Sequence, residues 1–228
     1  MRSLFDRIAD RYEFLNGLLT FGMDSSWRRR AVMALALPSG SLVLDVACGT
    51  GDVCRELHRQ GMRPVGVDFS EGMLRRARTP GPLLQADALR LPFADESFDG
   101  CTCAFALRNV ADPPALFAEV HRVLRPGGVL SLLEVARPDH PLLALGHRIW
   151  FDTMVPLLGG LLSDRAAYEY LPRSTAWLPS PVEIGELAAA TGFSSPLHAT
   201  FSLGVVQVFV ARKTSCAPGG GAGEGGGR

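Results

Sequence analysis

The chain has 228 residues, of which 47% are hydrophobic and 20% are charged. This composition is typical of one α/β domain with a single large core, and it excludes disorder or a small disulfide scaffold as a description of the whole chain. Lysine and arginine together number 23, as do aspartate and glutamate, so the formal charge is zero. No general electrostatic field is therefore expected to attract nucleic acid or an anionic membrane.

The two ends of the chain and its cysteines indicate the compartment. The N-terminal residues MRSLFDRIADRYEF interrupt their apolar positions with charges, which is unlike a signal peptide, so we expect a cytoplasmic protein. The five cysteines form no CxxC pair and have no histidine spacing typical of zinc, so reduced thiols and no metal site are expected. Residues 214–228 are rich in glycine and are predicted to form a disordered tail.

From residue 41 to residue 213 the apolar runs alternate between strand-like and helix-like periods, which is typical of helices packed around a parallel sheet. Strands are expected at 42–46, 64–68, 83–86, 98–105 and 129–135, and helices at 52–60, 71–78, 113–124 and 182–191. Two final runs, 197–203 and 205–212, meet at Gly204 like an antiparallel hairpin. The sequence therefore predicts one α/β domain over residues 1–213, with a Rossmann-like, mostly parallel, seven-stranded sheet.

Two segments stand outside this alternation. Residues 4–37 are helical in period, and residues 141–178 are rich in leucine and aromatic residues. Neither is needed to build the sheet, so both are predicted to cap the carboxyl ends of the strands, where open α/β sheets bind ligands. The apolar run 141–162 contains Arg148, Asp152 and Pro156, which argues against a membrane span.

The strand that carries Asp45 runs into the turn Cys48–Gly51 and then into a helix. Small residues let a ligand touch the backbone at a helix N-terminus, and both dinucleotides and S-adenosylmethionine are bound at such turns. A dinucleotide fold places a third glycine three residues after Gly51, where this chain has Cys54. Asp52 beside the turn is expected to repel a phosphate and to favour the positive sulfonium of S-adenosylmethionine over NAD. An ordinary tight turn without a ligand is the alternative.

Two further aspartates follow strands at the same edge of the expected sheet. Asp68 ends the second strand and can accept hydrogen bonds from both hydroxyls of a ribose, with helix capping as the alternative. Asp87 follows the third strand and can accept from an adenine amino group while the amide of Ala88 donates to the ring. Taken alone, an aspartate at that place is more often a turn residue.

Several short motifs occur in order between residues 4 and 213. They are Phe5–Ala9, Tyr12, Asn16, Leu18–Gly22, Trp27–Arg29, Ala106–Val110, Arg122–Gly128, Leu133–Glu134 and Tyr168–Pro172. Together they resemble the ubiquinone/menaquinone biosynthesis C-methyltransferases, a family of class I methyltransferases that use S-adenosylmethionine. The Tyr12 and Asn16 opening, the Leu-Arg-Asn turn and the Tyr-x-Tyr-Leu-Pro segment are the narrowest of these motifs.

The resemblance implies two sets of site residues. Those expected to surround S-adenosylmethionine are Asp45, Gly49, Thr50, Gly51, Asp68, Asp87, Ala88 and Ala104. Those expected to face a quinol head group, as catalytic residues, are Tyr12, Asn16, Arg108 and Asn109.

The resemblance further implies methylation of a ring carbon beside a hydroxyl of a 2-polyprenyl-1,4-quinol. Phenolate charge delocalises onto that carbon as the hydroxyl loses its proton, so Arg108 can stabilise the oxyanion directly or through a water molecule. Tyr12 and Asn16 can hold the quinol oxygens in line with the methyl group. The predicted reaction is demethylmenaquinol to menaquinol, with a ubiquinone precursor as the other acceptor of this family.

Two alternatives remain beside this prediction. One is a methyltransferase of another small molecule, such as a secondary-metabolite phenol or amine, and the other is a non-catalytic binding protein on the same fold. The partners expected are a small-molecule quinol and, because its tail lies in lipid, a membrane surface that residues 142–162 contact transiently at its inner face. No nucleic acid is expected, and an oligomer is left open.

Overall fold

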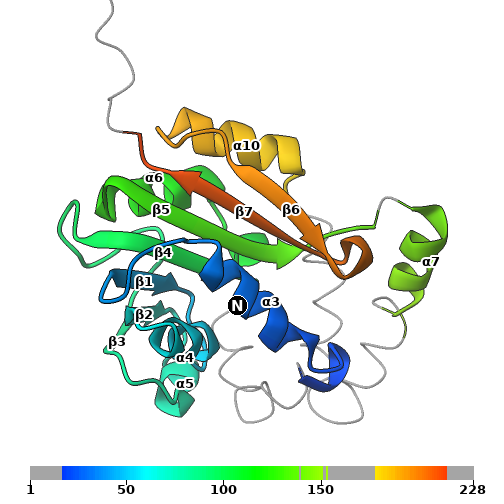
Figure 1. Ribbon diagram of the computed structural model, residues 1–228, viewed down its shortest axis with the longest axis horizontal. Coiled ribbons are helices and arrows are strands. Elements are labelled where there is room, and N and C mark those ends of the chain that lie inside the picture. The colour runs from blue at the N-terminus through cyan, green and yellow to red at the C-terminus, as the bar shows by residue number, and fades with distance from the viewer. Residues whose placement is uncertain (1–16, 139, 151–152, 154–177, 215–228) are drawn as a thin grey trace, which may run out of the picture.

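The computed structural model describes residues 17–138, 140–150, 153 and 178–214. Seven strands form one sheet in the order β3-β2-β1-β4-β5-β7-β6 (Figure 1). The strands are β1 Leu42–Val46, β2 Arg63–Asp68, β3 Leu83–Gln85, β4 Phe98–Ala104, β5 Leu124–Val135, β6 Leu197–Phe201 and β7 Val206–Arg212. Strands β1 to β5 pair in parallel, whereas β7 is antiparallel to both β5 and β6. The predicted fold class, with its antiparallel C-terminal hairpin, is confirmed.

Helices connect these strands and begin at the residues that capping chemistry favours. The Ser70 side chain accepts a hydrogen bond from the Met73 amide at the start of α5, and Ser180 forms a capping box with Glu183 in α10. The helices are α3 Met23–Met33, α4 Asp52–Arg59, α5 Glu71–Arg76, α6 Pro113–Val123, α7 Pro141–Ile149 and α10 Pro181–Ala190, with 3₁₀ turns η1 Leu107–Asn109 and η3 Ser202–Gly204.

The core lies on both faces of the sheet because successive strand residues point to opposite sides. On one face Val43 of β1 packs with Val32 of α3 and Leu57 of α4. On the other face Leu44 packs in the cluster that contains Phe117 of α6 and Ile184 of α10. The sheet is therefore covered on both sides, as expected for parallel strands.

The structure differs from the sequence expectation at α3. Trp27 and Ala31 pack against Leu133 of β5 and against β7, and the backbone carbonyl of Ala31 accepts a 2.8 Å hydrogen bond from the Ser131 hydroxyl. The second half of the expected N-terminal cap is thus part of the helical layer on the sheet. Residues 4–16 of that segment lie outside the described residues.

The second expected cap is described in part. Helix α7 stands to the side of the sheet, beyond the ends of β5 and β7 (Figure 1). Most of the remainder, 154–177, lies outside the described residues, as does the expected tail from residue 215 onward. Within the described ranges, no helix has the length and apolar character needed to cross a membrane.

Strand β5 begins at Leu124, five positions before the expected start. Its first residue pairs with Phe98 of β4, and the register then shifts before Gly100 pairs with Val129. The Pro126-Gly127-Gly128 sequence is therefore an irregularity inside the strand. The carboxyl ends of β1, β2 and β4 lie at the same height in the sheet, because Val46 pairs with both Val67 and Cys103.

Candidate functional site

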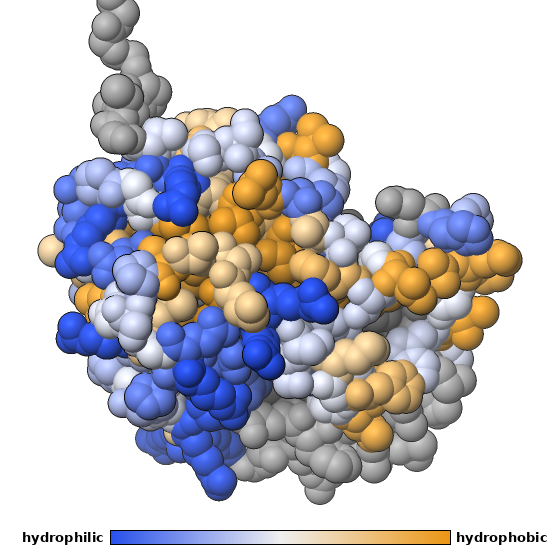
Figure 2. All heavy atoms as spheres, in the orientation of Figure 1, coloured by the Kyte–Doolittle hydropathy of each residue, from blue (hydrophilic) through white to orange (hydrophobic). Residues whose placement is uncertain are grey.

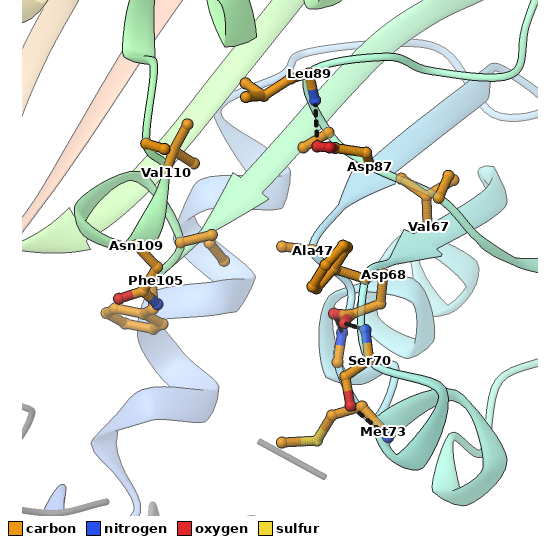
Figure 3. Close-up of a pocket in the computed structure, with 17 residues that line it drawn as sticks. Ala47, Val67, Asp68, Ser70, Met73, Asp87, Leu89, Phe105, Asn109 and Val110 are labelled. Carbon is orange, nitrogen blue, oxygen red and sulfur yellow. Dashed lines mark hydrogen bonds between the residues drawn. The ribbon is translucent and has the colours of Figure 1, made fainter. Parts of the chain in front are cut away.

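A cavity of about 350 Å³ opens at the carboxyl ends of the parallel strands (Figure 3). Its walls come from the segments that follow β1, β2, β3 and β4, and they are mainly apolar with a few polar groups, as is common for small-molecule sites. The predicted site residues that line it are Gly49, Asp68, Asp87, Ala88, Ala104 and Asn109.

A smaller hollow of about 40 Å³ adjoins this cavity under the glycine turn. Asp45 and Thr50 line it, together with Gly49 and Ala104, which also line the larger cavity. Gly51 lines neither space, and its φ of 87° shapes the turn into α4 as its N-cap. The structure therefore brings the eight predicted cofactor residues together in one continuous region.

Asp68 fastens the glycine turn to the end of β2. Its carboxylate accepts a 2.7 Å hydrogen bond from the Gly49 amide and a 2.8 Å hydrogen bond from the Ser70 amide (Figure 3). The helix cap of α5 is the side chain of Ser70, so capping does not account for Asp68. Its carboxylate faces the cavity, where a ribose can donate to it.

Asp87, at the turn after β3, lines the same cavity as Asp68 (Figure 3). Its carboxylate accepts a 2.9 Å hydrogen bond from the amide of Leu89, which makes it a turn residue as well as a wall of the cavity. Ala88 lines the cavity beside it. Two carboxylates at separate points of one cavity wall fit a group with hydrogen-bond donors at two places, such as an adenosine.

Asp45 lies beneath the turn and is 1% exposed. The Thr102 hydroxyl donates a 2.8 Å hydrogen bond to its carboxyl and the Cys54 thiol donates at 3.3 Å. Burial is the main cause that raises the pKa of Asp45 to about 7. This aspartate therefore braces the turn from below, with Cys54 filling the place of a third glycine.

Thr50 carries an unpaired polar group at this position. Its hydroxyl is buried, and no hydrogen-bond partner for it is found in the part of the chain that the structure describes. An unpaired buried hydroxyl costs free energy unless a ligand completes it. The charged amino-acid end of S-adenosylmethionine offers both donors and acceptors, so the donor set around the hollow fits this cofactor.

Asp52 lies beside the turn as expected and lines the small hollow, but it does not stand there as an isolated charge. Its carboxylate pairs with Arg55 and with the Arg28 guanidinium at 3.2 Å, so its negative charge is compensated. Arg28 comes from α3, which the sequence analysis assigned to a cap, and this contact spans 24 positions. The other acidic side chains that line the cavity are Asp68 and Asp87.

The predicted head-group residues are described in part. Asn109 of η1 lines the cavity, whereas Arg108 is not among the lining residues. The Arg108 guanidinium pairs with Glu134, and the two side chains are 8% and 0% exposed. The buried Nε of Arg108 has no hydrogen-bond partner among the described residues. Tyr12 and Asn16 lie outside the described residues.

Two aromatic residues of the site were not predicted. Phe69 follows Asp68 and is 50% exposed on the cavity, and Phe105 follows β4 with a φ of 56°. The place of Phe69, directly after an acidic strand end, was a signal available in the sequence. Phe105 gave none, because its strained backbone is visible only in the structure.

Comparison with known proteins supports the resemblance drawn from the motifs. The model of the ubiE/COQ5 methyltransferase family matches residues 1–213. A demethylmenaquinone methyltransferase of Roseiflexus sp. is 42% identical over 220 residues, which is 92% of each chain. The demethylmenaquinone methyltransferase of Thermus thermophilus is 41% identical, over 90% of this chain and 98% of its own.

Solved structures agree on the fold. A SAM-dependent methyltransferase of Thermotoga maritima, described as a possible histamine N-methyltransferase, superposes with a TM-score of 0.70 at 24% identity, over 94% of this chain and 100% of its own. At that identity the likeness establishes a class I methyltransferase fold. The length and the identity of the sequence matches establish more: the chain belongs to the ubiE/COQ5 methyltransferase family, and the predicted enzyme class, an S-adenosylmethionine-dependent methyltransferase, is confirmed.

Proposed function

We propose that this enzyme transfers a methyl group from S-adenosylmethionine to a ring carbon of a demethylated polyprenyl quinol, converting demethylmenaquinol to menaquinol. The observation that carries the proposal is the cavity itself, which Asp68 and Asp87 both line beside a glycine turn with an unpaired Thr50 hydroxyl. The relatives named demethylmenaquinone methyltransferase support the choice of acceptor.

Each cofactor residue has a distinct part in this proposal. Asp68 accepts from the ribose hydroxyls, while Asp87 and the Ala88 amide bind the adenine. The Thr50 hydroxyl and the backbone of the turn bind the amino-acid end, and Asp45 supports the turn through Thr102 and Cys54. Bound in this way, S-adenosylmethionine supplies a methyl group on a positive sulfur.

The acceptor side of the cavity begins at η1. Asn109 lines the wall and can hold a quinol oxygen. Arg108 is next to it in the sequence, pairs with Glu134 and keeps an Nε donor without a partner among the described residues. In this proposal its positive charge stabilises the phenolate. A fixed charge at a developing oxyanion is often a large catalytic contribution. Tyr12 and Asn16 complete the head-group site in this proposal.

A membrane surface is the proposed source of the substrate. Leu142, Leu145 and Ile149 of α7 are 73%, 48% and 52% exposed and recur at the spacing of one helical face. Figure 2 shows hydrophobic side chains gathered over α7. The ring of Trp150, after this helix, lies 5.1 Å from that of Phe21, which is 71% exposed. We infer that this apolar surface contacts the inner face of the cytoplasmic membrane, where a polyprenyl tail resides.

The experiment is a transfer reaction with labelled substrate. The protein is incubated with methyl-labelled S-adenosylmethionine and a reduced short-chain demethylmenaquinone, and mass analysis locates the label. The proposal predicts label on the ring carbon beside the hydroxyl. Label on oxygen would refute the carbon-transfer mechanism, and transfer to phenols or amines but not to the quinol would favour another small-molecule acceptor.

A further inference from the structure

Four residues line both the larger cavity and the smaller hollow. They are Ala47, Gly49, Ala104 and Phe105. The first three have no side chain beyond Cβ, so only backbone and methyl groups shape the passage between the two spaces. Phe105 instead presents an aromatic ring at this passage (Figure 3). A large ring at a narrow junction calls for a physical explanation.

The chemistry of the cofactor supplies that explanation. In S-adenosylmethionine the sulfonium joins the adenosyl group to the amino-acid end. The proposed function, on which this inference rests, places the first in the larger cavity and the second at the Thr50 hollow. The positive sulfur then lies at the junction. We propose that the ring of Phe105 recognises this sulfonium through a cation–π interaction.

The ring is held in place from two sides. The Phe105 amide donates a 2.7 Å hydrogen bond to the Leu133 carbonyl, and Trp27 packs edge-on against the ring with centroids 6.4 Å apart. The residue adopts a φ of 56°, which a bulky side chain rarely tolerates. Backbone strain of this kind persists where surrounding structure enforces it and concentrates at functional sites.

A second cation already lies near the ring. The guanidinium carbon of Arg28 is 6.0 Å from the ring centroid of Phe105. Asp24 and Asp52 both pair with this arginine, so its positive charge is compensated and does not repel a bound sulfonium. The Arg28 contact shows that the geometry around Phe105 suits a positive group.

This assignment has a consequence for product release. S-Adenosylhomocysteine has a neutral sulfur, so a π face attracts it less than it attracts the sulfonium, whereas hydrogen bonds that the nucleoside donates to Asp68 or Asp87 are the same in both ligands. The ring therefore discriminates the methyl donor from the spent product.

The test compares the affinities of the two ligands by calorimetry in the absence of acceptor. In Phe105→Leu the ratio of S-adenosylmethionine affinity to S-adenosylhomocysteine affinity is expected to fall about 5- to 30-fold, the range set by a partly desolvated cation–π contact. Phe69→Leu is the matched control, because Phe69 lines the larger cavity but not the hollow. It is expected to weaken both ligands by the same factor, so that the ratio stays unchanged.

A second variant guards against loss of the fold. Trifluorophenylalanine incorporated at position 105 keeps the ring shape and removes its negative face, and it is expected to lower the ratio in the same direction, while Phe105→Tyr preserves it. If the wild type binds both ligands and the fluorinated protein has the same ratio of S-adenosylmethionine to S-adenosylhomocysteine affinity, the inference is overturned while the proposed function stands. If the wild type binds neither ligand, the proposed function fails first and this inference fails with it.

Discussion

The three aspartates of the site differ most in their surroundings. Asp45 is buried and accepts hydrogen bonds from the Thr102 and Cys54 side chains. Asp68 accepts hydrogen bonds from two backbone amides, and Asp87 is exposed at the cavity wall. The same type of side chain therefore supports the turn from inside the core, fastens the turn to β2, and lines the cavity wall. Because these environments differ, substitutions at the three positions are expected to give different signatures.

Asp45 gives the stability of the fold a dependence on pH. Its folded pKa of about 7 lies above the ordinary value of 3.8, so the folded protein holds this proton more tightly than the unfolded chain does. The contribution of Asp45 to the free energy of unfolding is therefore full at low pH, falls as pH rises between about 4 and 7, and is level above that range. Asp45→Asn removes this change.

The measurement is denaturant unfolding of wild type and Asp45→Asn across that range, because subtraction cancels other titrating groups. We expect the stability of wild type minus that of the variant to decline toward pH 7. A difference independent of pH would contradict the buried, protonated state of Asp45.

Asp68→Ala is expected to lower the affinity for S-adenosylmethionine by about 100-fold or more, since charge-assisted hydrogen bonds to the ribose and the fastening of Gly49 are lost together. Calorimetry measures it. Asp99→Ala is the control: Asp99 accepts from the Leu42 amide at 2.8 Å and pairs with Arg125 at the opposite ends of the strands. That variant loses stability and retains cofactor affinity. Equal effects of the two variants would deny Asp68 a role in binding.

Arg108→Ala is expected to reduce turnover by about 100-fold or more and to leave cofactor affinity unchanged, because it removes the positive charge that stabilises the oxyanion. The change also leaves Glu134 buried without its partner, which costs about 3–5 kcal/mol of stability. The double variant Arg108→Met with Glu134→Gln removes both charges and restores the fold. Steady-state kinetics should show the same lost turnover in it, and native turnover there would exclude Arg108 from catalysis.

Residue-level prediction from the sequence succeeded where position along a strand determines position in space. Asp68 and Asp87 follow strands whose carboxyl ends meet at one edge, so their place was predictable. The pairing of Asp52 with Arg28 was not, since it depends on how α3 packs across a long sequence separation. Periodicity carries no information on that contact.

At the scale of elements, the strands and most helices were predicted within a few residues, because the central strands are short, continuously apolar runs and Ser70 gives a strong start signal. Helix α3 was assigned to the wrong layer. Its sequence MDSSWRRRAVM carries two serines and three arginines in succession, so it resembles a surface helix. Only its packing shows that Trp27 and Val32 are 5% and 0% exposed.

The packing of α3 and the segment after it against the sheet is tested at Leu35, just beyond the end of the helix. Leu35 is fully buried against the sheet, whereas Met33 is 57% exposed two positions earlier. Leu35→Ala is expected to lower the free energy of unfolding by about 2–5 kcal/mol, and Met33→Ala by less than about 0.5 kcal/mol. Chemical denaturation measures both. Similar small losses would mean that this segment is a dispensable cap.

For the whole molecule, the order of the strands explains the site. Strand β1 lies between β2 and β4, so the segments after these three strands converge, and β3 adds the Asp87 turn beside β2. Residues 45–51, 68–70, 86–89 and 104–111 meet at one edge although they are far apart in the chain. The alternation of elements was enough to predict this meeting point.

The proposed contact with lipid is tested on the exposed face of α7. Replacing Leu142, Leu145 and Ile149 of α7 with serine is expected to reduce binding to neutral phosphatidylcholine liposomes about 10-fold or more, because about 0.8 kcal/mol is lost for each buried methylene. Vesicle sedimentation measures it. Leu197→Ser, a 78% exposed residue on β6, is the control and should bind normally. Unchanged binding by the α7 variant would contradict membrane contact through that helix.

The central claim is that the cavity between Asp68 and Asp87 holds the nucleoside of the methyl donor. A crystal structure with S-adenosylhomocysteine tests it most directly. The expected result is ribose hydroxyls on the Asp68 carboxylate, adenine at Asp87 and Ala88, and an amino-acid end at the Thr50 hydroxyl. An empty cavity, or a nucleotide phosphate bound at the Gly49 turn in a competing soak, would contradict it.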